Sequence, residues 1–197
     1  MDTTERLRVK LILGSTRPSR FSEKAGAWIK EQAAKRPEFD IELLDLREYQ
    51  LPFYDESVSP STIKDGNYAK DEVKRWSEKI READAYIIVA PEYNHGIPAV
   101  LKNALDYVYY EWNRKPVAFI AYGSVAGARS VEQLREVAVE LQMAPVRQAV
   151  HIPNPWELLE ENGSLKKGAL DPYQKSAAIM LDNLLWWGRA LKAARAA

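Results

Sequence analysis

The chain has 197 residues, 46% of them hydrophobic, and its 28 Lys and Arg residues balance its 28 Asp and Glu residues. These values are ordinary for a globular protein, and the neutral balance argues against a nucleic-acid partner or an anionic membrane surface. Because there is no cysteine, disulfides, thiol catalysis, iron–sulfur clusters and thiolate zinc sites are excluded. We expect no metal site, and any chemistry must use other side chains or a cofactor.

The first residues carry charges of both signs and no apolar stretch, which is not the pattern of a signal peptide. The apolar run at 11–13 is far too short to span a bilayer. The cytosol is therefore the expected compartment.

Predicted strands and helices alternate along the chain. Strands are predicted where short runs are apolar, and helices where apolar residues recur at helical spacing. The predicted strands cover 7–13, 39–46, 85–90, 116–122 and 146–152; the predicted helices cover 22–36, 70–82, 99–110, 130–143 and 174–194. The run AYIIVA at 85–90 is the strongest signal for a strand at the centre of a sheet.

This alternation predicts one α/β domain over residues 1–197, with a parallel sheet covered by helices on both faces. The segment 47–64 is irregular and contains Pro52 and Pro60. Connections of that length are often functional. Ligands of such sheets bind beyond the carboxyl ends of the strands, and three polar, glycine-containing loops follow directly after predicted strands.

The first loop is GSTRPSRFS at 14–22. It combines hydroxyls, backbone N–H groups and a guanidinium before a helix, which suits a phosphate. It matches neither the phosphate loop of nucleotide hydrolases nor the dinucleotide-binding fingerprint. The alternative is an ordinary strand-to-helix turn with a serine at the N-cap.

The second loop is PEYNHGIP at 91–98, in which two prolines add stiffness and Gly96 permits an unusual φ. A stiff loop with exposed backbone groups can bind the edge of a flat heterocycle. A structural turn before the next helix would have the same sequence pattern and is the alternative interpretation. The third loop, YGSVAGAR at 122–129, allows close backbone approach at Gly123 and Gly127. Its serine is one position too early for the nucleophile elbow of hydrolases.

Together these loops resemble the NADPH-dependent FMN reductase family, whose members include quinone, chromate and azo-dye reductases. The match is carried by Gly14-Ser15-x-Arg17, by the long block from Pro91-Glu92-Tyr93-Asn94 to Leu101-Lys102-Asn103-Ala104-Leu105-Asp106, and by Tyr122-Gly123-x-x-x-Gly127-x-Arg129. It covers nearly the whole chain, including the segment LPFY at 51–54. Ala99 stands where many relatives have glycine.

The resemblance implies a flavodoxin-like three-layer fold with a five-stranded parallel sheet in the order 2-1-3-4-5. It implies that FMN is the cofactor, that NADPH or NADH is the co-substrate, and that a small molecule accepts the electrons. The implied phosphate-binding residues are Ser15, Arg17 and Ser22, with Gly14 in the same motif; the implied ring contacts are Pro91, Glu92, Tyr93, Asn94, His95, Gly96, Gly123, Ser124 and Gly127. His95 receives no role from the match.

No side chain is predicted as a catalytic acid or base, because the flavin supplies the redox chemistry. Two alternatives remain open: a flavodoxin-type electron carrier, and a binding protein that has lost its cofactor. The resemblance also implies a homodimer or homotetramer. Aromatic residues at 107–112 and the pair Trp186 and Trp187 predict either core packing or a subunit interface, and Asp45 is expected to be a solvated acid at a strand end.

Overall fold

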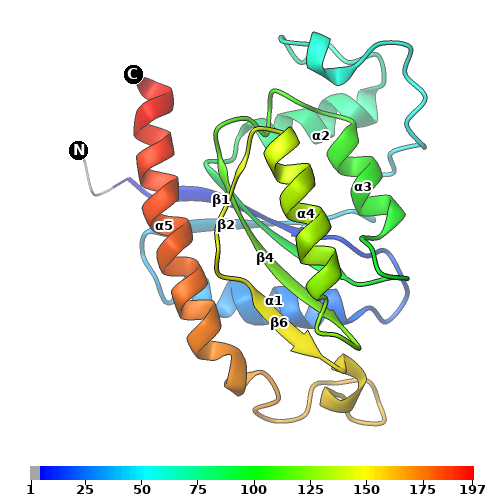
Figure 1. Ribbon diagram of the computed structural model, residues 1–197, viewed down its shortest axis with the longest axis vertical. Helices are drawn as coiled ribbons and strands as arrows, with labels where there is room; N and C mark the ends of the chain where they lie inside the picture. Colours follow the sequence, from blue (N-terminus) through cyan, green and yellow to red (C-terminus); the bar gives the residue numbers. More distant parts are fainter. Residues whose placement is uncertain (1–4) are drawn as a thin grey trace.

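A parallel sheet lies between two layers of helices in the computed structural model, which describes residues 5–197 (Figure 1). The strands are β1 (Leu7–Leu13), β2 (Phe39–Asp45), β3 (Ala85–Pro91), β4 (Pro116–Gly123), β5 (Ala144–Pro145) and β6 (Val150–Pro153). Their order is β2-β1-β3-β4-β5, and β6 also pairs with β4. The predicted fold class and the order 2-1-3-4-5 are confirmed.

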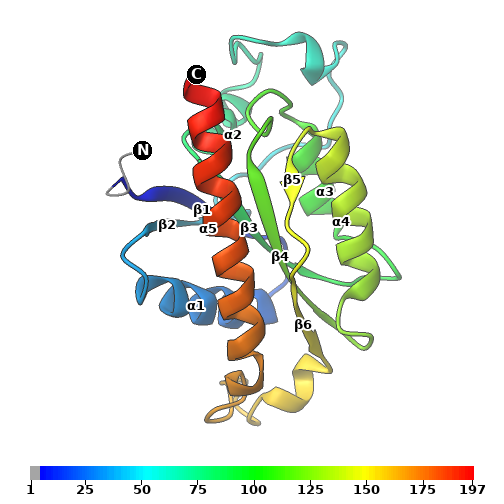
Figure 2. The same cartoon turned by 60° about the vertical axis from the view of Figure 1, so that its left-hand side comes forward.

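The helices divide between the two faces of the sheet (Figure 2). On one face, α1 (Phe21–Ala34) and α5 (Gln174–Ala196) share a buried cluster with the sheet. On the other, α2 (Asp71–Arg81), α3 (Ala99–Asp106) and α4 (Ala128–Glu140) form a second cluster. The described part of the chain also contains three short 3-10 helices: η1 (Pro60–Thr62), η2 (Pro155–Leu158) and η3 (Asp171–Tyr173). Within residues 5–197, no helix has both the length and the apolar character needed to cross a membrane.

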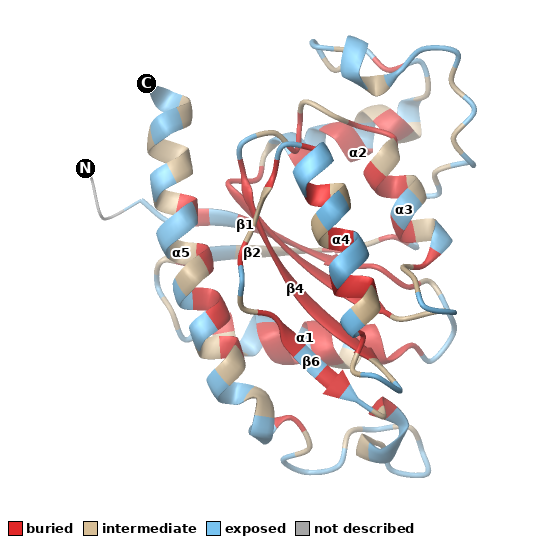
Figure 3. Ribbon diagram, in the orientation of Figure 1, coloured by how far each residue is buried: buried red, intermediate tan, exposed pale blue. Residues whose placement is uncertain are grey.

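The central strands are buried on both faces, as Figure 3 shows in red. Every residue of β3 is buried, and so is every residue of β4 except the last. Continuous apolar runs are typical of strands that are covered by helices on each side. The sheet therefore holds its strand ends, and the loops that follow them, in fixed positions.

The fifth strand is interrupted, which corrects the prediction of one strand over 146–152. Residues 144–145 pair with the start of β4 and residues 150–153 with its end. Between them the chain bends at Arg147, whose carbonyl oxygen accepts a hydrogen bond of 2.6 Å from Arg135. Edge strands tolerate such bends because they lose ladder hydrogen bonds on one side only.

The helix predicted over 99–110 ends at Asp106, because the aromatic residues after it turn back into the core. Tyr107 and Trp112 are buried, and Trp112 donates its indole N–H to the carbonyl of Leu105 at 3.2 Å. Tyr109 and Tyr110 are partly buried and hydrogen-bonded to other loops. Core packing therefore accounts for Tyr107 and Trp112, and contacts with neighbouring segments hold Tyr109 and Tyr110 in place.

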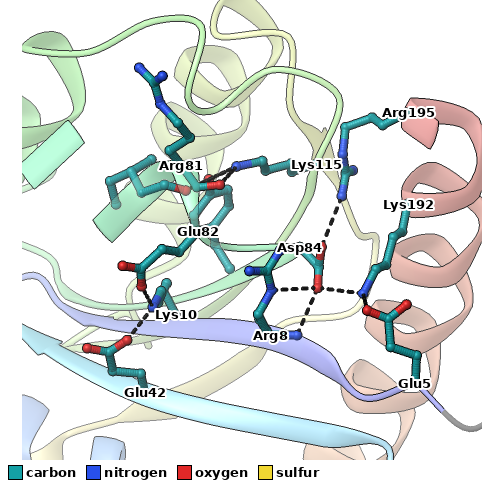
Figure 4. Close-up of polar contacts among 12 residues, drawn as sticks. Glu5, Arg8, Lys10, Glu42, Arg81, Glu82, Asp84, Lys115, Lys192 and Arg195 are labelled. Carbon is teal, nitrogen blue, oxygen red and sulfur yellow. Dashed lines mark hydrogen bonds and ion pairs between the residues drawn. The ribbon is translucent and has the colours of Figure 1, made fainter. Parts of the chain in front are cut away.

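Charged side chains gather at the amino ends of the strands (Figure 4). The carboxylate of Asp84 is 4% exposed and pairs with Arg8, Lys192 and Arg195. Burial works to raise the pKa of Asp84, but the backbone N–H of Arg8 and the ammonium of Lys192 together lower it below its usual value. This cluster ties the last turns of α5 to β1 and β3.

Lys115 is buried beside this cluster and donates to the carbonyls of Ile80 and Arg81 at 3.0 Å and to the hydroxyl of Tyr86 at 3.2 Å. Burial lowers its pKa to about 7, whereas an unfolded chain has the ordinary lysine value. Between these two pKa values the amine of Lys115 is protonated in the unfolded chain but not in the folded protein. The free energy of unfolding is therefore expected to rise with pH, by up to about 1.4 kcal/mol per pH unit.

The measurement is urea unfolding of the wild type and of Lys115→Met at pH 7, 8 and 9. The free energy of unfolding of the wild type, minus that of Lys115→Met, should rise with pH by roughly that slope. All other titrating groups are present in both proteins, so their contributions cancel. Parallel pH profiles would show that Lys115 keeps an ordinary pKa in the folded protein.

Candidate functional site

Two cavities lie at the edge where β1, β3, β4 and β6 end. The Trp156 cavity, of about 340 Å³, is lined by Arg17, Pro18, Ser19, Arg20, Phe21, Pro91, Glu92, Tyr93, Tyr122, Gly123, Ser124, Pro155, Trp156 and Leu159. The Phe53 cavity, of about 410 Å³, is lined by Ser15, Thr16, Arg17, Leu51, Phe53, Tyr93, Pro98, Ala99, Val100 and Asn103. Both have the size of small-molecule sites. Arg17 and Tyr93 belong to both linings and form the wall between them.

The loop between β1 and α1 is held in shape by Arg20. Its guanidinium, 1% exposed, pairs with both carboxylate oxygens of Asp45 and donates to the carbonyl of Ser15. The expectation that Asp45 is a solvated acid is wrong, because its side chain is only 17% exposed and serves as the counter-ion of Arg20. Burial opposes ionisation, but the hydrogen bond from Arg20 contributes to a net lowering of the pKa of Asp45.

A second arginine, Arg47, donates to the carbonyls of Thr16 and Arg17. With the bond from Arg20 to Ser15, three successive carbonyls of the loop have cationic donors. Their partial negative charges are thereby compensated, which favours an anion beside this loop. The sequence analysis missed this supporting role for both arginines.

Arg17 itself is exposed and lies over the ring of Tyr93, with its guanidinium carbon 5.7 Å from the ring centroid. Within residues 5–197 its guanidinium has no hydrogen bond or ion pair. The hydroxyl of Tyr93 is 2.9 Å from Oγ of the buried Ser15. Tyr93 is thus fixed between β1 and the second loop, whereas Arg17 keeps its donors available to a ligand.

Ser22 lies in the first turn of α1 and is fully buried. Its Oγ lies next to the phenol of Tyr122, and a hydrogen bond between these two side chains works to lower the pKa of that phenol; no other partner of Oγ is found among the described residues. Ser22 lines neither cavity. Burial raises the pKa of Tyr122 to about 12, so the phenol is protonated at neutral pH. The helix has Arg20 as its N-cap and no side-chain cap, so its first N–H groups remain available to an anion.

The loop after β3 forms a tight turn at residues 93–96, closed by two backbone hydrogen bonds between Tyr93 and Gly96 of 2.9 and 3.0 Å. The left-handed residues are Asn94, with φ 49°, and His95, with φ 70°. The expectation that Gly96 carries the unusual φ is therefore wrong. A two-residue turn of this kind places both positive angles at its central positions, where asparagine is well tolerated.

The second and third loops are joined by Glu92. Its carboxylate, 6% exposed, accepts from the side chain of Arg129 at 2.7 Å and from its backbone N–H at 3.1 Å. Arg129 also lies 2.8 Å from Nε2 of His95, and the hydroxyl of Ser130 donates to the carbonyls of Pro91, before the turn, and of Gly96, at its end. Glu92 is thus a structural clamp, and His95 is an exposed member of the same network.

The predicted glycines have different positions. Gly123 and Ser124 line the Trp156 cavity. Gly127, with φ 69°, instead packs on β4: an added Cβ would lie 2.6 Å from the backbone nitrogen of Tyr122. Gly14 packs in the same way: a Cβ added there would lie 3.0 Å from the carbonyl oxygen of Val89. Gly14 and Gly127 permit close packing of the chain on itself, and neither lines a cavity.

Two exposed aromatic residues at the cavities were not predicted. Trp156, 57% exposed, lies on η2 after β6, and Phe53, 81% exposed, lies in the long segment after β2. A large apolar side chain that is exposed at a cavity is a usual sign of ligand or partner contact. The proline-bounded loops that carry them were visible in the sequence, but the direction of each ring was not.

The arrangement has two chemical capacities. The start of α1, which has no side-chain cap, and the free donors of Arg17 can bind an anion. A flat ring fits in the same cavity, where Phe21, Tyr122 and Trp156 supply aromatic surface and the backbone at 91–93 and 123–124 supplies polar groups.

Comparison with known proteins agrees with this geometry. Residues 7–157 match the family model described as NADPH-dependent FMN reductase. An NAD(P)H-dependent FMN reductase of Schizosaccharomyces pombe is 34% identical over 84% of this chain and 79% of its own length. A quinone reductase of Pseudomonas putida is 26% identical over 80% of this chain and 83% of its own length.

The fold is shared with solved flavoenzymes. The NAD(P)H:(acceptor) oxidoreductase FerB of Paracoccus denitrificans superposes with a TM-score of 0.70 at 23% identity, covering 90% of this chain and 97% of the other. An azoreductase, AzrA, superposes with a TM-score of 0.55 at 16% identity, covering 93% of this chain and 98% of the other.

Proposed function

The chain belongs to the NADPH-dependent FMN reductase family, and on that premise we propose that FMN binds in the Trp156 cavity. Family membership makes the protein an oxidoreductase that uses FMN and takes its electrons from NADPH or NADH. The single observation that carries the assignment of the cavity is the free guanidinium of Arg17, which lines it next to the start of α1, a helix with no side-chain cap.

The phosphate end of FMN is assigned to the loop between β1 and α1. The first N–H groups of α1 and the guanidinium of Arg17 supply donors of the kind that recognise a phosphate dianion. The hydroxyl of Ser22, which the family resemblance also implies, is fully buried and lines neither cavity. Arg20 contributes indirectly: it holds the carbonyl of Ser15 and is itself neutralised by Asp45. Ser15, engaged with Tyr93, fixes the neighbouring wall.

The isoalloxazine ring is assigned to the space between the second and third loops. Residues 91–93 and 123–124 border this part of the cavity, and the clamp between Glu92 and Arg129 keeps the two loops at a fixed separation. The turn at Asn94, His95 and Gly96 closes the same loop. Gly14 and Gly127 act by letting the loops pack closely on the sheet.

When bound, FMN supplies the two-electron chemistry that links a reduced nicotinamide to a second acceptor. The contribution of the chain is to hold the cofactor and to leave one side of the cavity open to co-substrates. We propose a quinone as the acceptor, on the strength of the relatives named quinone reductase. No side chain is assigned as an acid or base.

The test is anaerobic mixing of the FMN-loaded protein with NADPH and, separately, with NADH. Rapid bleaching of the flavin absorbance, followed by recovery when a quinone is added, is the expected result. A yellow protein that NAD(P)H does not bleach would have the behaviour of a flavodoxin-type carrier, for which the comparisons give no support. A protein that does not bind FMN at all would contradict the proposal as a whole.

Replacing Arg17 by alanine is expected to weaken FMN binding by about 1.5–3 kcal/mol, which raises the Kd about 10- to 150-fold. The reason is the loss of charge-assisted hydrogen bonds to the phosphate. Fluorescence titration of the apoprotein with FMN measures the effect, and titration with riboflavin, which lacks the phosphate, should show no difference between the variants.

Lys30→Ala is the matched control, because Lys30 is an exposed cation on α1 that lines neither cavity. Its FMN affinity should equal that of the wild type. If Arg17→Ala also binds FMN with wild-type affinity, Arg17 does not contact the phosphate.

We retain a cytosolic location, a single domain and a homodimer or homotetramer as parts of the proposal. The exposed rings of Trp186 and Trp187, 65% and 40% accessible on α5, support self-association, since aromatic side chains are enriched at subunit interfaces.

A further inference from the structure

Large apolar side chains are exposed on the outer side of α5, the helix that forms one side of the molecule (Figure 1). Ile179, Trp186 and Trp187 are exposed, and the rings of the two tryptophans lie edge to face with their centroids 5.0 Å apart. The opposite side of the same helix is packed on the sheet. A helix that is apolar on two sides has a second surface to bury, and exposed apolar patches mark interaction sites.

A cavity of about 440 Å³ lies beside Trp186 and is lined by Asp182, Leu185, Trp186, Arg189 and Ala190. Among the residues that the structure describes, all of this lining comes from α5, so no other element supplies an opposite wall. Small-molecule sites enclose most of the surface of their ligand, which one helix cannot do. A partner that brings a wall of its own, such as a second helix, fits this surface better.

The charges on this surface are arranged symmetrically about Leu185 and Trp186. Asp182 precedes Leu185 by the same spacing at which Arg189 follows Trp186, and both charged residues line the cavity. When two copies of α5 pack antiparallel and cross at Leu185 and Trp186, Asp182 of each copy faces Arg189 of the other. A two-fold contact requires this kind of self-complementary surface.

The surroundings of Asp182 allow a second cation to bind. Its Oδ1 pairs with Arg36 at 2.7 Å, and its side chain is still 67% exposed. A carboxylate can accept from more than one donor, so a guanidinium from another copy can bind beside Arg36. One turn farther from the centre, Ala178 and Ala193 oppose each other in the same arrangement, and small side chains let the backbones of two helices approach closely.

We propose that α5 packs antiparallel on α5 of a second copy of the chain, with Leu185 and Trp186 at the centre and reciprocal ion pairs between Asp182 and Arg189. The inference rests only on the part of the proposed function that concerns self-association, because this surface shares no lining residue with the two cavities of the candidate site. A membrane is a poorer occupant, since helices that bind lipid interfaces separate an apolar side from a charged one. A single pair of helices is a small interface, so we expect a reversible association with a Kd on the order of micromolar.

The test is analytical ultracentrifugation of Asp182→Arg, of Arg189→Asp and of their equimolar mixture. Each variant alone brings like charges together at both contacts, so its association through α5 should be at least about tenfold weaker than that of the wild type. In the mixture, one copy carries two cations at these positions and the other carries two carboxylates, so both contacts again join opposite charges. Association should therefore return in the mixture, and only between unlike copies.

Trp186→Ala removes the apolar centre without changing a charge and should also weaken association about tenfold or more. Glu140→Arg is the matched control for charge reversal, because Glu140 is exposed on α4, which packs on the other face of the sheet; its association should equal that of the wild type. Flavin bleaching by NADPH should be unchanged in all four variants, since none of the replaced residues lines a cavity of the candidate site. Association as expected without bleaching would contradict only the assignment of the FMN site.

Three results would overturn the inference. One is a wild type that stays monomeric over the whole concentration range. The second is a pair of charge variants that associate as the wild type does, or whose mixture associates no better than each variant alone. The third is flotation of the monomeric wild type with phosphatidylglycerol vesicles, lost in Trp186→Ala, which would make a membrane the occupant of this surface.

Discussion

Arg20→Ala is expected to lower the free energy of unfolding by about 3–5 kcal/mol, the cost of breaking a buried ion pair by removing one partner. The guanidinium of Arg20 is 1% exposed and binds both oxygens of Asp45, Glu23 and the carbonyl of Ser15. Its removal leaves the carboxylate of Asp45 mostly buried without its main counter-ion. Urea unfolding at pH 7 measures the loss.

Two further variants identify the cause. Arg20→Met combined with Asp45→Leu should recover most of the stability, because replacing both charges by apolar groups removes the cost of a buried unpaired ion. Arg36, two residues beyond the end of α1, forms a partly exposed ion pair with Asp182 and a hydrogen bond to the carbonyl of Ala178; Arg36→Ala removes both and should cost about 1 kcal/mol. Equal losses in Arg20→Ala and Arg36→Ala would contradict a special role for the buried pair.

The site should be affected by the same change. Arg20 fixes the carbonyl of Ser15, and Ser15 in turn contacts Tyr93 in the wall between the two cavities. Arg20→Ala is therefore expected to weaken FMN binding as well as folding. Fluorescence titration of the Arg20→Ala apoprotein with FMN measures the loss of affinity, at a temperature where the variant is fully folded.

Gly127→Ala is expected to destabilise the protein by about 2–5 kcal/mol, from the combined cost of a left-handed non-glycine residue and of overpacking. Its φ of 69° is one part of the effect. The larger part is a collision with the main chain of β4, since the new Cβ would lie 2.5 Å from Cβ of Ala121 and 2.6 Å from the nitrogen of Tyr122. Neither atom can move without disturbing the sheet.

Gly163→Ala separates the two contributions. Gly163 has a φ of 78° but nothing within 4 Å of the added Cβ, so it should show only the backbone cost of about 1–2 kcal/mol. Thermal or urea unfolding of both variants gives the comparison. If Gly127→Ala costs no more than Gly163→Ala, the loop accommodates a side chain and the packing argument for Gly127 fails.

The loop between β3 and α3 has backbone angles and side-chain partners that its sequence did not predict. Its two prolines and its glycine indicated a stiff loop, with a structural turn before the next helix as the alternative interpretation. The sequence did not indicate that Asn94 and His95, rather than Gly96, carry the positive φ angles, because that depends on which two residues close the hairpin. Likewise, the sequence did not indicate that the carboxylate of Glu92 is paired with Arg129, whose Nε lies 2.7 Å from it in the folded chain.

The sequence by itself determined the layers and the edge at which the three loops meet. Both follow from apolar periodicity and from the rule that parallel strands end on the same side, which are local or topological. The order of the strands came only from the family resemblance that the three loops carry. Only the tertiary structure decided which of two arginines in one loop is free for a ligand. Arg17 and Arg20 differ because Asp45, on another strand, reaches one of them and not the other, and a pairing between residues so far apart in sequence has no local pattern.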